Sequence, residues 1–195
     1  AVDYRKKSKF GFESYPSPTI STCVVEPYNA LLSTHWLLDH TEISVVLDNE
    51  ALYEISQKWL DIKRPSYDTL NRMIAKVLSS MTASLRFAGE LNVDLNEFQT
   101  NLVPFPRLHF MVTSMAPITT PKKAETMQND VQNVSESCLD SKNFFVKILN
   151  FDPEEDKYMA ISLNYRGKVK SKEANATVQW LKTNKKVSFV EWCPT

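Results

Sequence analysis

The chain has 195 residues, and its hydrophobic content of 43% is enough to form a core, which excludes a disordered tail. Its 23 basic and 23 acidic residues give a formal net charge of zero, so no general field attracts nucleic acid or an anionic membrane. The three separated cysteines form no metal-binding or disulfide pattern and indicate reduced, buried thiols of a cytosolic protein. No apolar run approaches the roughly 20 residues of a membrane-spanning helix, so we expect a soluble protein without a nucleic-acid or membrane partner.

The first half of the chain alternates predicted strands with predicted helices. After a basic run and a short strand, the β-branched stretch 19–25 is predicted as a strand, and Glu26-Pro27 then begins a helix. Residues 43–47 are predicted as a buried strand, and Asp48-Asn49 begins a helix over 51–60. This alternation indicates a parallel sheet with helices on its faces.

The longest predicted helix spans residues 67–87. Apolar residues recur in it at steps of three and four, which is typical of an amphipathic helix with one buried face: Leu70, Ile74, Val77, Leu78, Met81 and Leu85. At 1.5 Å per residue this helix would be roughly 30 Å long, with Gly89 just after its end. Its two ends would therefore be held far apart.

The second half mixes short helices with strands. Asp94 is predicted to cap a short helix, and Glu97 stands at the spacing of a capping box, so its simplest role is to bond back to the amide of Asp94. Further helices are predicted at 130–139 and 171–183. Strands are predicted at 108–115, 158–165 and 187–192, with a long polar loop at 117–133.

Polar and aromatic residues gather at the predicted helix starts. Ligands of parallel sheets bind outside the carboxyl ends of the strands, where helices begin, and Glu26, Asn49, Tyr67 and Asn71 lie in or beside such starts. An asparagine amide can pair with a purine edge, a tyrosine ring can stack on a base, and a carboxylate can accept hydrogen bonds from a ribose. The residues alone leave structural roles open as well: Asn49 as a helix cap, Glu26 as a partner of the helix dipole, Tyr67 as core.

Six ordered segments spread over the full chain carry a family resemblance. They are V-V-E-P-Y-N (24–29), D-N-E-A (48–51), L-N-V-D-L-N-E-F-Q-T-N-L-V-P-F-P-R-L-H-F (91–110), K-Y-M-A (157–160), Y-R-G (165–167) and F-V-E-W-C-P-T (189–195). Together these segments resemble the α-tubulins. The resemblance implies an α/β fold of the tubulin/FtsZ type: a Rossmann-like half of a parallel sheet with a long central helix, then an α+β intermediate domain with a mixed sheet.

The resemblance also implies a division into domains. Residues 1–86 would be the C-terminal half of a GTP-binding domain including the central helix, and residues 87–195 an incomplete intermediate domain. A glycine-rich phosphate loop and the ligands of Mg²⁺ would lie outside this segment. We therefore expect these residues to fold only within a longer chain.

Site residues follow from the same resemblance. Thr22 and Glu26 would contact the sugar of GTP, Asn49 and Asn71 would read the guanine, and Tyr67 would stack on it. This nucleotide would be trapped within an αβ dimer and not hydrolysed. Glu97 would be the catalytic carboxylate, acting in trans on the GTP of the next dimer's β chain.

The implied partners are β-tubulin in a heterodimer and along the polymer, a neighbouring α-tubulin laterally, and microtubule-associated proteins and motors. The implied location is the cytoplasmic microtubule cytoskeleton, including spindle or axoneme. The chain departs from the family at 117–129, where Glu125 and Thr126 replace an aromatic-histidine pair, which puts ordinary lateral contacts in question. The alternative is a truncated tubulin-like binding module that neither holds nucleotide nor polymerises.

Overall fold

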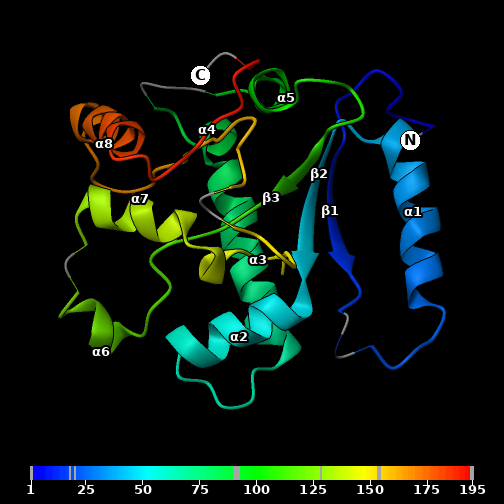
Figure 1. Cartoon of the computed structure of the whole chain (residues 1–195), viewed down its shortest axis with the longest axis horizontal. Helices are drawn as coiled ribbons and strands as arrows, with labels where there is room; N and C mark the ends of the chain where they lie inside the picture. The colour runs from blue at the N-terminus through cyan, green and yellow to red at the C-terminus, as the bar shows by residue number, and fades with distance from the viewer. Residues whose placement is uncertain are drawn as a thin grey trace.

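A parallel sheet lies at the centre of the protein, with its strands in the order β1-β2-β3. The strands are β1 (Phe10–Tyr15), β2 (Ile43–Asp48) and β3 (Phe110–Val112), and both pairings are parallel, with Tyr15 opposite Asp48 at the carboxyl end (Figure 1). The computed structural model describes residues 2–17, 19, 21–89, 93–127, 129–152 and 155–193. The sheet confirms the predicted α/β class.

Strand β2 is the most buried element of the sheet. Ile43 is 1% exposed, and Val45 and Leu47 are each 3% exposed. Ser44 between them is completely buried, so both faces of the strand are covered. A short apolar, β-branched run of this kind suits a central parallel strand, as predicted for residues 43–47.

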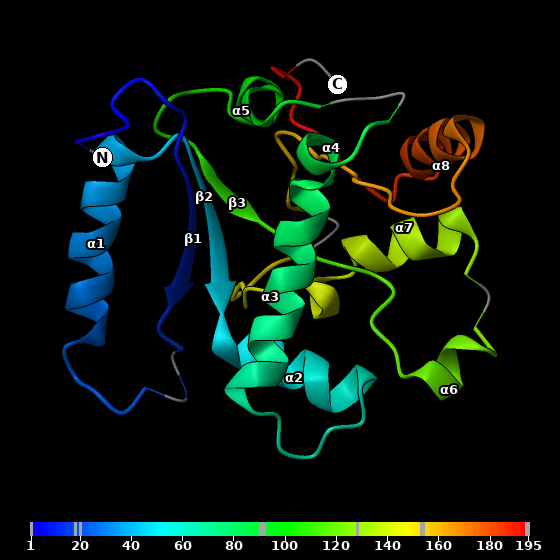
Figure 2. The same cartoon turned by 180° about the vertical axis from the view of Figure 1, so that it is seen from behind.

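Three helices surround this sheet. Helix α1 (Glu26–His40) lies beside the outer edge formed by β1, α2 (Asn49–Trp59) lies beyond the carboxyl end of β2, and α3 (Tyr67–Met81) crosses one face (Figures 1 and 2). Each begins where its local sequence predicts. Proline occupies the first turn of α1, and the side chain of Asp48 caps α2 by accepting a hydrogen bond from the Glu50 amide.

The prediction of one continuous helix over 67–87 is wrong. Helix α3 ends at Met81, and a separate short helix, α4 (Ala83–Arg86), follows. Thr82 has φ −92° and ψ 0°, and its hydroxyl donates to the carbonyl of Leu78 at 2.8 Å. Hydroxyl side chains that compete for backbone groups in this way favour a bend or an end to a helix. The rod is therefore about 22 Å long at 1.5 Å per residue.

The apolar stripe of α3 is also narrower than predicted. Leu70 and Val77 are buried, and Met73, which the stripe did not include, is 4% exposed. Leu78 is 37% exposed, and Leu85 in α4 is 52% exposed. The buried face thus follows 70, 73 and 77, a spacing of three and four residues.

The strand predicted over 19–25 is absent in the described part of that range. Residues Ser21, Thr22 and Cys23 are irregular and exposed, and Val24 is 89% exposed. A β-branched stretch forms a strand only where another strand pairs with it, and no described strand pairs with residues 21–25. Residues 21–25 instead lead into α1 without forming a strand.

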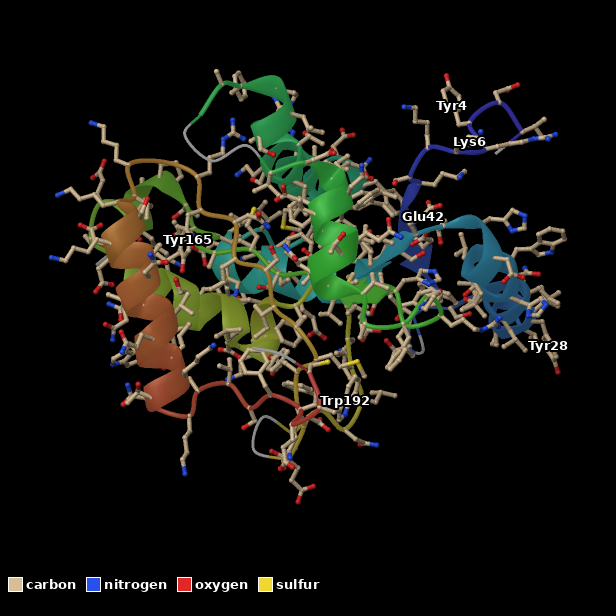
Figure 3. All side chains as sticks on the ribbon, turned by 90° about the horizontal axis from the view of Figure 1, so that it is seen from above. Tyr4, Lys6, Tyr28, Glu42, Tyr165 and Trp192 are labelled. Carbon is tan, nitrogen blue, oxygen red and sulfur yellow. The ribbon has the colours of Figure 1, made fainter. Side chains whose placement is uncertain are left out.

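The second half carries further short helices. They are α5 (Leu95–Leu102), α6 (Pro121–Ala124), α7 (Val131–Leu139), a 3₁₀ turn (Ser141–Asn143) and α8 (Ser171–Thr183). Helices α7 and α8 match the predicted ranges, and the Ser135 hydroxyl on α7 lies 2.6 Å from the hydroxyl of Tyr165 (Figure 3). This contact joins α7 to the segment before α8.

The strands expected in the second half are mostly reduced to single bridges. Strand β3 occupies the centre of the predicted range 108–115, and Ser114 forms an antiparallel bridge with Phe144. The ranges 158–165 and 187–192 meet in a parallel bridge between Tyr158 and Phe189. Pairing in both directions is what a mixed sheet requires, but the described residues form no regular strand there.

The cysteines are free thiols, as expected, but they are not buried. Cys23 is exposed, and Cys138 and Cys193 are half-buried. Across the residues that the structure describes, no helix is both long and apolar enough to span a bilayer.

Leucine truncations along α3 test the buried face. Replacement of Leu70, which is 1% exposed, by alanine should cost about 2–5 kcal/mol of stability, because the cavity cannot be refilled. Leu78→Ala on the same helix is the matched control and should cost clearly less. Thermal unfolding of the full-length protein measures both, and equal losses would contradict the observed packing.

Candidate functional site

A cavity of about 740 Å³ opens at the carboxyl ends of β1 and β2. Its walls come from the end of β1 and the loop after it, the first three turns of α1, and the starts of α2 and α3. This is the place where parallel sheets bind ligands, and the volume is that of a small-molecule site. The cavity therefore brings together segments that are distant in the sequence.

Four of the five predicted nucleotide-binding residues line this cavity: Thr22, Glu26, Asn49 and Tyr67. Asn71 does not belong to the cavity wall. It is exposed on α3, four residues after Tyr67 and so on the same side of the helix.

Two of the structural roles left open by the sequence are wrong. The cap of α2 is Asp48, whose Oδ1 accepts from the Glu50 amide at 2.9 Å, so Asn49 does not cap the helix. Tyr67 is 67% exposed and is not a core residue. Glu26 stands in the first turn of α1, where a carboxylate also complements the helix dipole, so that role stays open.

Glu13 is a cavity residue that the sequence analysis missed. Its side chain projects from β1, and Oε1 accepts a hydrogen bond from the Ser44 hydroxyl at 3.4 Å. A Cβ atom at Gly11 would lie 1.7 Å from this oxygen, so glycine makes the position of the carboxylate possible. Residues two apart in a strand share a face, and the pattern Gly-Phe-Glu could have pointed to this arrangement.

The environment of Glu13 disfavours its charged form. Burial raises the pKa of this carboxyl group. The hydrogen bond from Ser44 and the nearby His109 lower it, but burial is the larger effect. The Oε2 atom is buried without a hydrogen-bond partner among the described residues. His109 is completely buried, with Nε2 3.2 Å from the Thr41 hydroxyl.

Two further contacts shape the cavity wall. The hydroxyls of Tyr15 and Thr34 lie 2.7 Å apart and join the end of β1 to α1. Ser17 donates a hydrogen bond to Glu50 at the start of α2. That hydrogen bond, with those from Thr19 and Lys147, lowers the pKa of Glu50 to about 2.

Glu97 lies far from this cavity, in the first turn of α5. Figure 1 shows α5 and α2 near opposite ends of α3, and the Ser8 hydroxyl before β1 donates to Asn96 at 2.6 Å. The predicted capping box is wrong: the Glu97 amide donates to the backbone carbonyl of Asp94, while the Glu97 carboxylate makes no hydrogen bond within the described residues. Its carboxylate is exposed and available to a partner.

No group of three or more His, Cys, Asp or Glu side chains in the described ranges is arranged to hold a metal ion. The groups that the cavity does bring together are the amide of Asn49, the ring of Tyr67 and the carboxylates of Glu13 and Glu26.

Comparisons with known proteins all point to the tubulins. A model described as the tubulin/FtsZ family GTPase domain matches residues 1–57, and one described as the tubulin C-terminal domain matches residues 106–195. The tubulin alpha-3 chain of Zea mays is 54% identical over 195 residues, which is 100% of this chain and 43% of that relative. The chain thus spans less than half the length of this relative.

Glu13→Gln should stabilise the full-length protein near neutral pH. The pKa of Glu13 is higher in the folded protein than its ordinary value of 4.5, so folding favours the protonated carboxyl group. The stability that this contributes is fully present below pH 4.5 and is lost as the pH rises through the pKa of the folded state. The neutral amide avoids that loss, so its stabilising advantage should grow as the pH rises from about 5 towards neutrality. Thermal midpoints across this range measure it, with Glu125→Gln on the exposed loop as control; a lower midpoint for Glu13→Gln would contradict the burial cost.

Proposed function

The chain belongs to the tubulin family, of the α-tubulin type, and from that premise we propose that its cavity binds the guanine nucleotide of a microtubule subunit. The single observation that carries the proposal is the cavity of about 740 Å³ at the carboxyl edge of the parallel sheet, lined from three helix starts. In this proposal residues 1–86 belong to the GTP-binding domain of the full-length protein and residues 87–195 to its intermediate domain.

The side chains in the cavity suit a guanine nucleoside. The Asn49 amide offers both a donor and an acceptor to the base edge, and the exposed ring of Tyr67 offers a stacking surface. Glu26 and Thr22 offer oxygen atoms to ribose hydroxyls. Asn71 would reach the base from the next turn of α3, although it lies outside the cavity wall.

Phosphate contacts and Mg²⁺ would come from other parts of the full-length protein. Mg²⁺ would neutralise charge on the phosphates when bound, and the described residues offer no cluster of ligands for it. The contribution of this segment is therefore to bind and orient the nucleoside.

Glu97 has a separate role in the proposal. When subunits stack lengthwise, its exposed carboxylate would meet the GTP of the next β-tubulin, orient the attacking water and accept its proton as the water oxygen bonds to the γ-phosphorus. The bond from that phosphorus to the β-phosphate oxygen breaks in the same step. Neither subunit then has a complete hydrolytic site until the two meet, and the nucleotide in this chain's own cavity is not hydrolysed.

The proposal includes the polymer. The chain would pair with β-tubulin as a heterodimer and along the filament, contact a neighbouring α-tubulin laterally, and offer surfaces to microtubule-associated proteins and motors. It would act in the cytoplasmic microtubule cytoskeleton, spindle and axoneme included. The alternative, a truncated module without nucleotide, predicts an empty cavity in the purified protein.

Tyrosine variants test nucleotide binding. In the full-length heterodimer, Tyr67→Ala should weaken guanine nucleotide retention about tenfold or more, because stacking contributes about 1–3 kcal/mol per base. The matched control is Tyr28→Ala: Tyr28 is 68% exposed against 67% for Tyr67, but it points outward from α1 (Figure 3). Nucleotide content by chromatography measures both. A wild-type heterodimer that contains only the one guanine nucleotide of β-tubulin would support the alternative and reject the proposal.

Glu97→Ala should leave assembly intact and reduce GTP turnover in the polymer by roughly 100-fold or more, as expected for loss of a general base. Glu173→Ala is the control, because Glu173 is also an exposed glutamate at the third position of a helix. Phosphate release from assembled polymer is the measurement. Unchanged release from the Glu97 variant would exclude the catalytic role.

A further inference from the structure

Lys147 connects the second half of the chain to α2, the helix whose start lines the cavity. Its Nζ lies 2.9 Å from Oε1 of Glu50 and 2.5 Å from Oε1 of Glu54, both on α2. The other carboxylate oxygen of Glu50 accepts the hydrogen bond from Ser17, which lines the cavity. A continuous chain of polar contacts therefore runs from Lys147 through Glu50 to the cavity.

The backbone near Lys147 is held in place by β-type hydrogen bonds. The Phe145 amide donates to the carbonyl of Thr113 at 2.9 Å, and the amide of Asp48 donates to the carbonyl of Phe145 at 2.8 Å. The Phe145 side chain is completely buried. Lys147 follows two residues later, so its position relative to the end of β2 is set by the tertiary fold.

The two carboxylates that Lys147 contacts differ in how deeply they are buried. The side chain of Glu54 is 59% exposed, and an exposed ion pair contributes little. The side chain of Glu50 is 10% exposed, and a buried carboxylate that loses its cation is left with an uncompensated charge. Hydrogen bonds from Lys147 to Glu54 and Glu50 raise the pKa of the lysine, so the ammonium stays charged at neutral pH. The contact with Glu50 is therefore the one that matters for the cavity.

Ser17 holds the loop that borders the cavity. Its hydroxyl donates to Glu50 and also accepts a hydrogen bond from the backbone amide of Thr19 at 3.3 Å. The same loop leads on to Thr22, which lines the cavity. Movement of the Glu50 carboxylate would therefore shift the backbone at Ser17, which borders the proposed nucleotide site.

We propose that Lys147 is a positioning residue for nucleotide binding, acting through Glu50 on Ser17. The proposal rests on the function assigned to the cavity and adds a route by which the intermediate domain sets the affinity of the nucleotide site. A shift of the backbone around Phe145 and Lys147 loosens the loop at Ser17, and a bound nucleotide in turn stabilises the position of Lys147.

Release of the guanine nucleotide bound by this subunit, measured in the full-length heterodimer apart from the nucleotide of β-tubulin, tests the proposal. Lys147→Met should speed release roughly tenfold, because it removes a hydrogen bond between charged groups. Lys147→Arg keeps the charge and should restore slow release. Ser17→Ala should speed release as well, and the double variant should match the faster single variant, since both changes break one chain of contacts.

The matched control is Lys186→Met, which removes a lysine whose Nζ lies 2.8 Å from Glu136, in the second half and away from the cavity. Release from this variant should equal that from the wild type. Unchanged release from Lys147→Met, failure of Lys147→Arg to restore it, or additive effects in the double variant would each overturn the proposal. A wild-type heterodimer that retains only the guanine nucleotide of β-tubulin would instead reject the proposed function, and the role of Lys147 with it.

Discussion

The end of β2 at Asp48 is the point on which the rest of the structure depends. Its backbone amide donates to the carbonyl of Phe145, its side chain caps α2, and in register it faces Tyr15 on β1. Burial raises the pKa of Asp48. The hydrogen bond from the Glu50 amide and other backbone hydrogen bonds lower it by less. One residue therefore ends the central strand, begins the helix at the cavity and attaches the second half of the chain.

This junction explains why a binding site can form from dispersed residues. Parallel strands end at one edge, and the helices that follow them begin there, so Glu26 and Asn49 come from successive strand-to-helix connections and still line one cavity. Lys147, from the other half, contacts Glu50 beside the cavity wall. The buried carboxylate of Glu50 thus contacts both Ser17 in the cavity wall and Lys147 from the second half.

Helix α3 separates the two sites proposed for this subunit. Tyr67 stands at its first residue, beside the cavity, while Glu97 lies beyond its other end on α5. The break at Thr82 means that no single rod joins them, and α4 and the segment leading to α5 intervene. Mechanical coupling along α3 would therefore have to pass through this break, whereas the contact of Lys147 with Glu50 links the halves directly.

The sequence by itself determined the α/β class, the family, the starts of α1, α2, α7 and α8, and four residues of the cavity wall. The helix starts follow from signals that act within a few residues, such as Pro27 after Glu26 or the cap at Asp48, whereas the family follows from the resemblance of six segments along the chain. Only the tertiary structure decided that residues 21–25 form no strand, that α3 ends at Met81, and that Lys147 meets Glu50. Strand pairing, burial and ion pairs depend on partners distant in the chain, and local patterns carry no information about which partner is present.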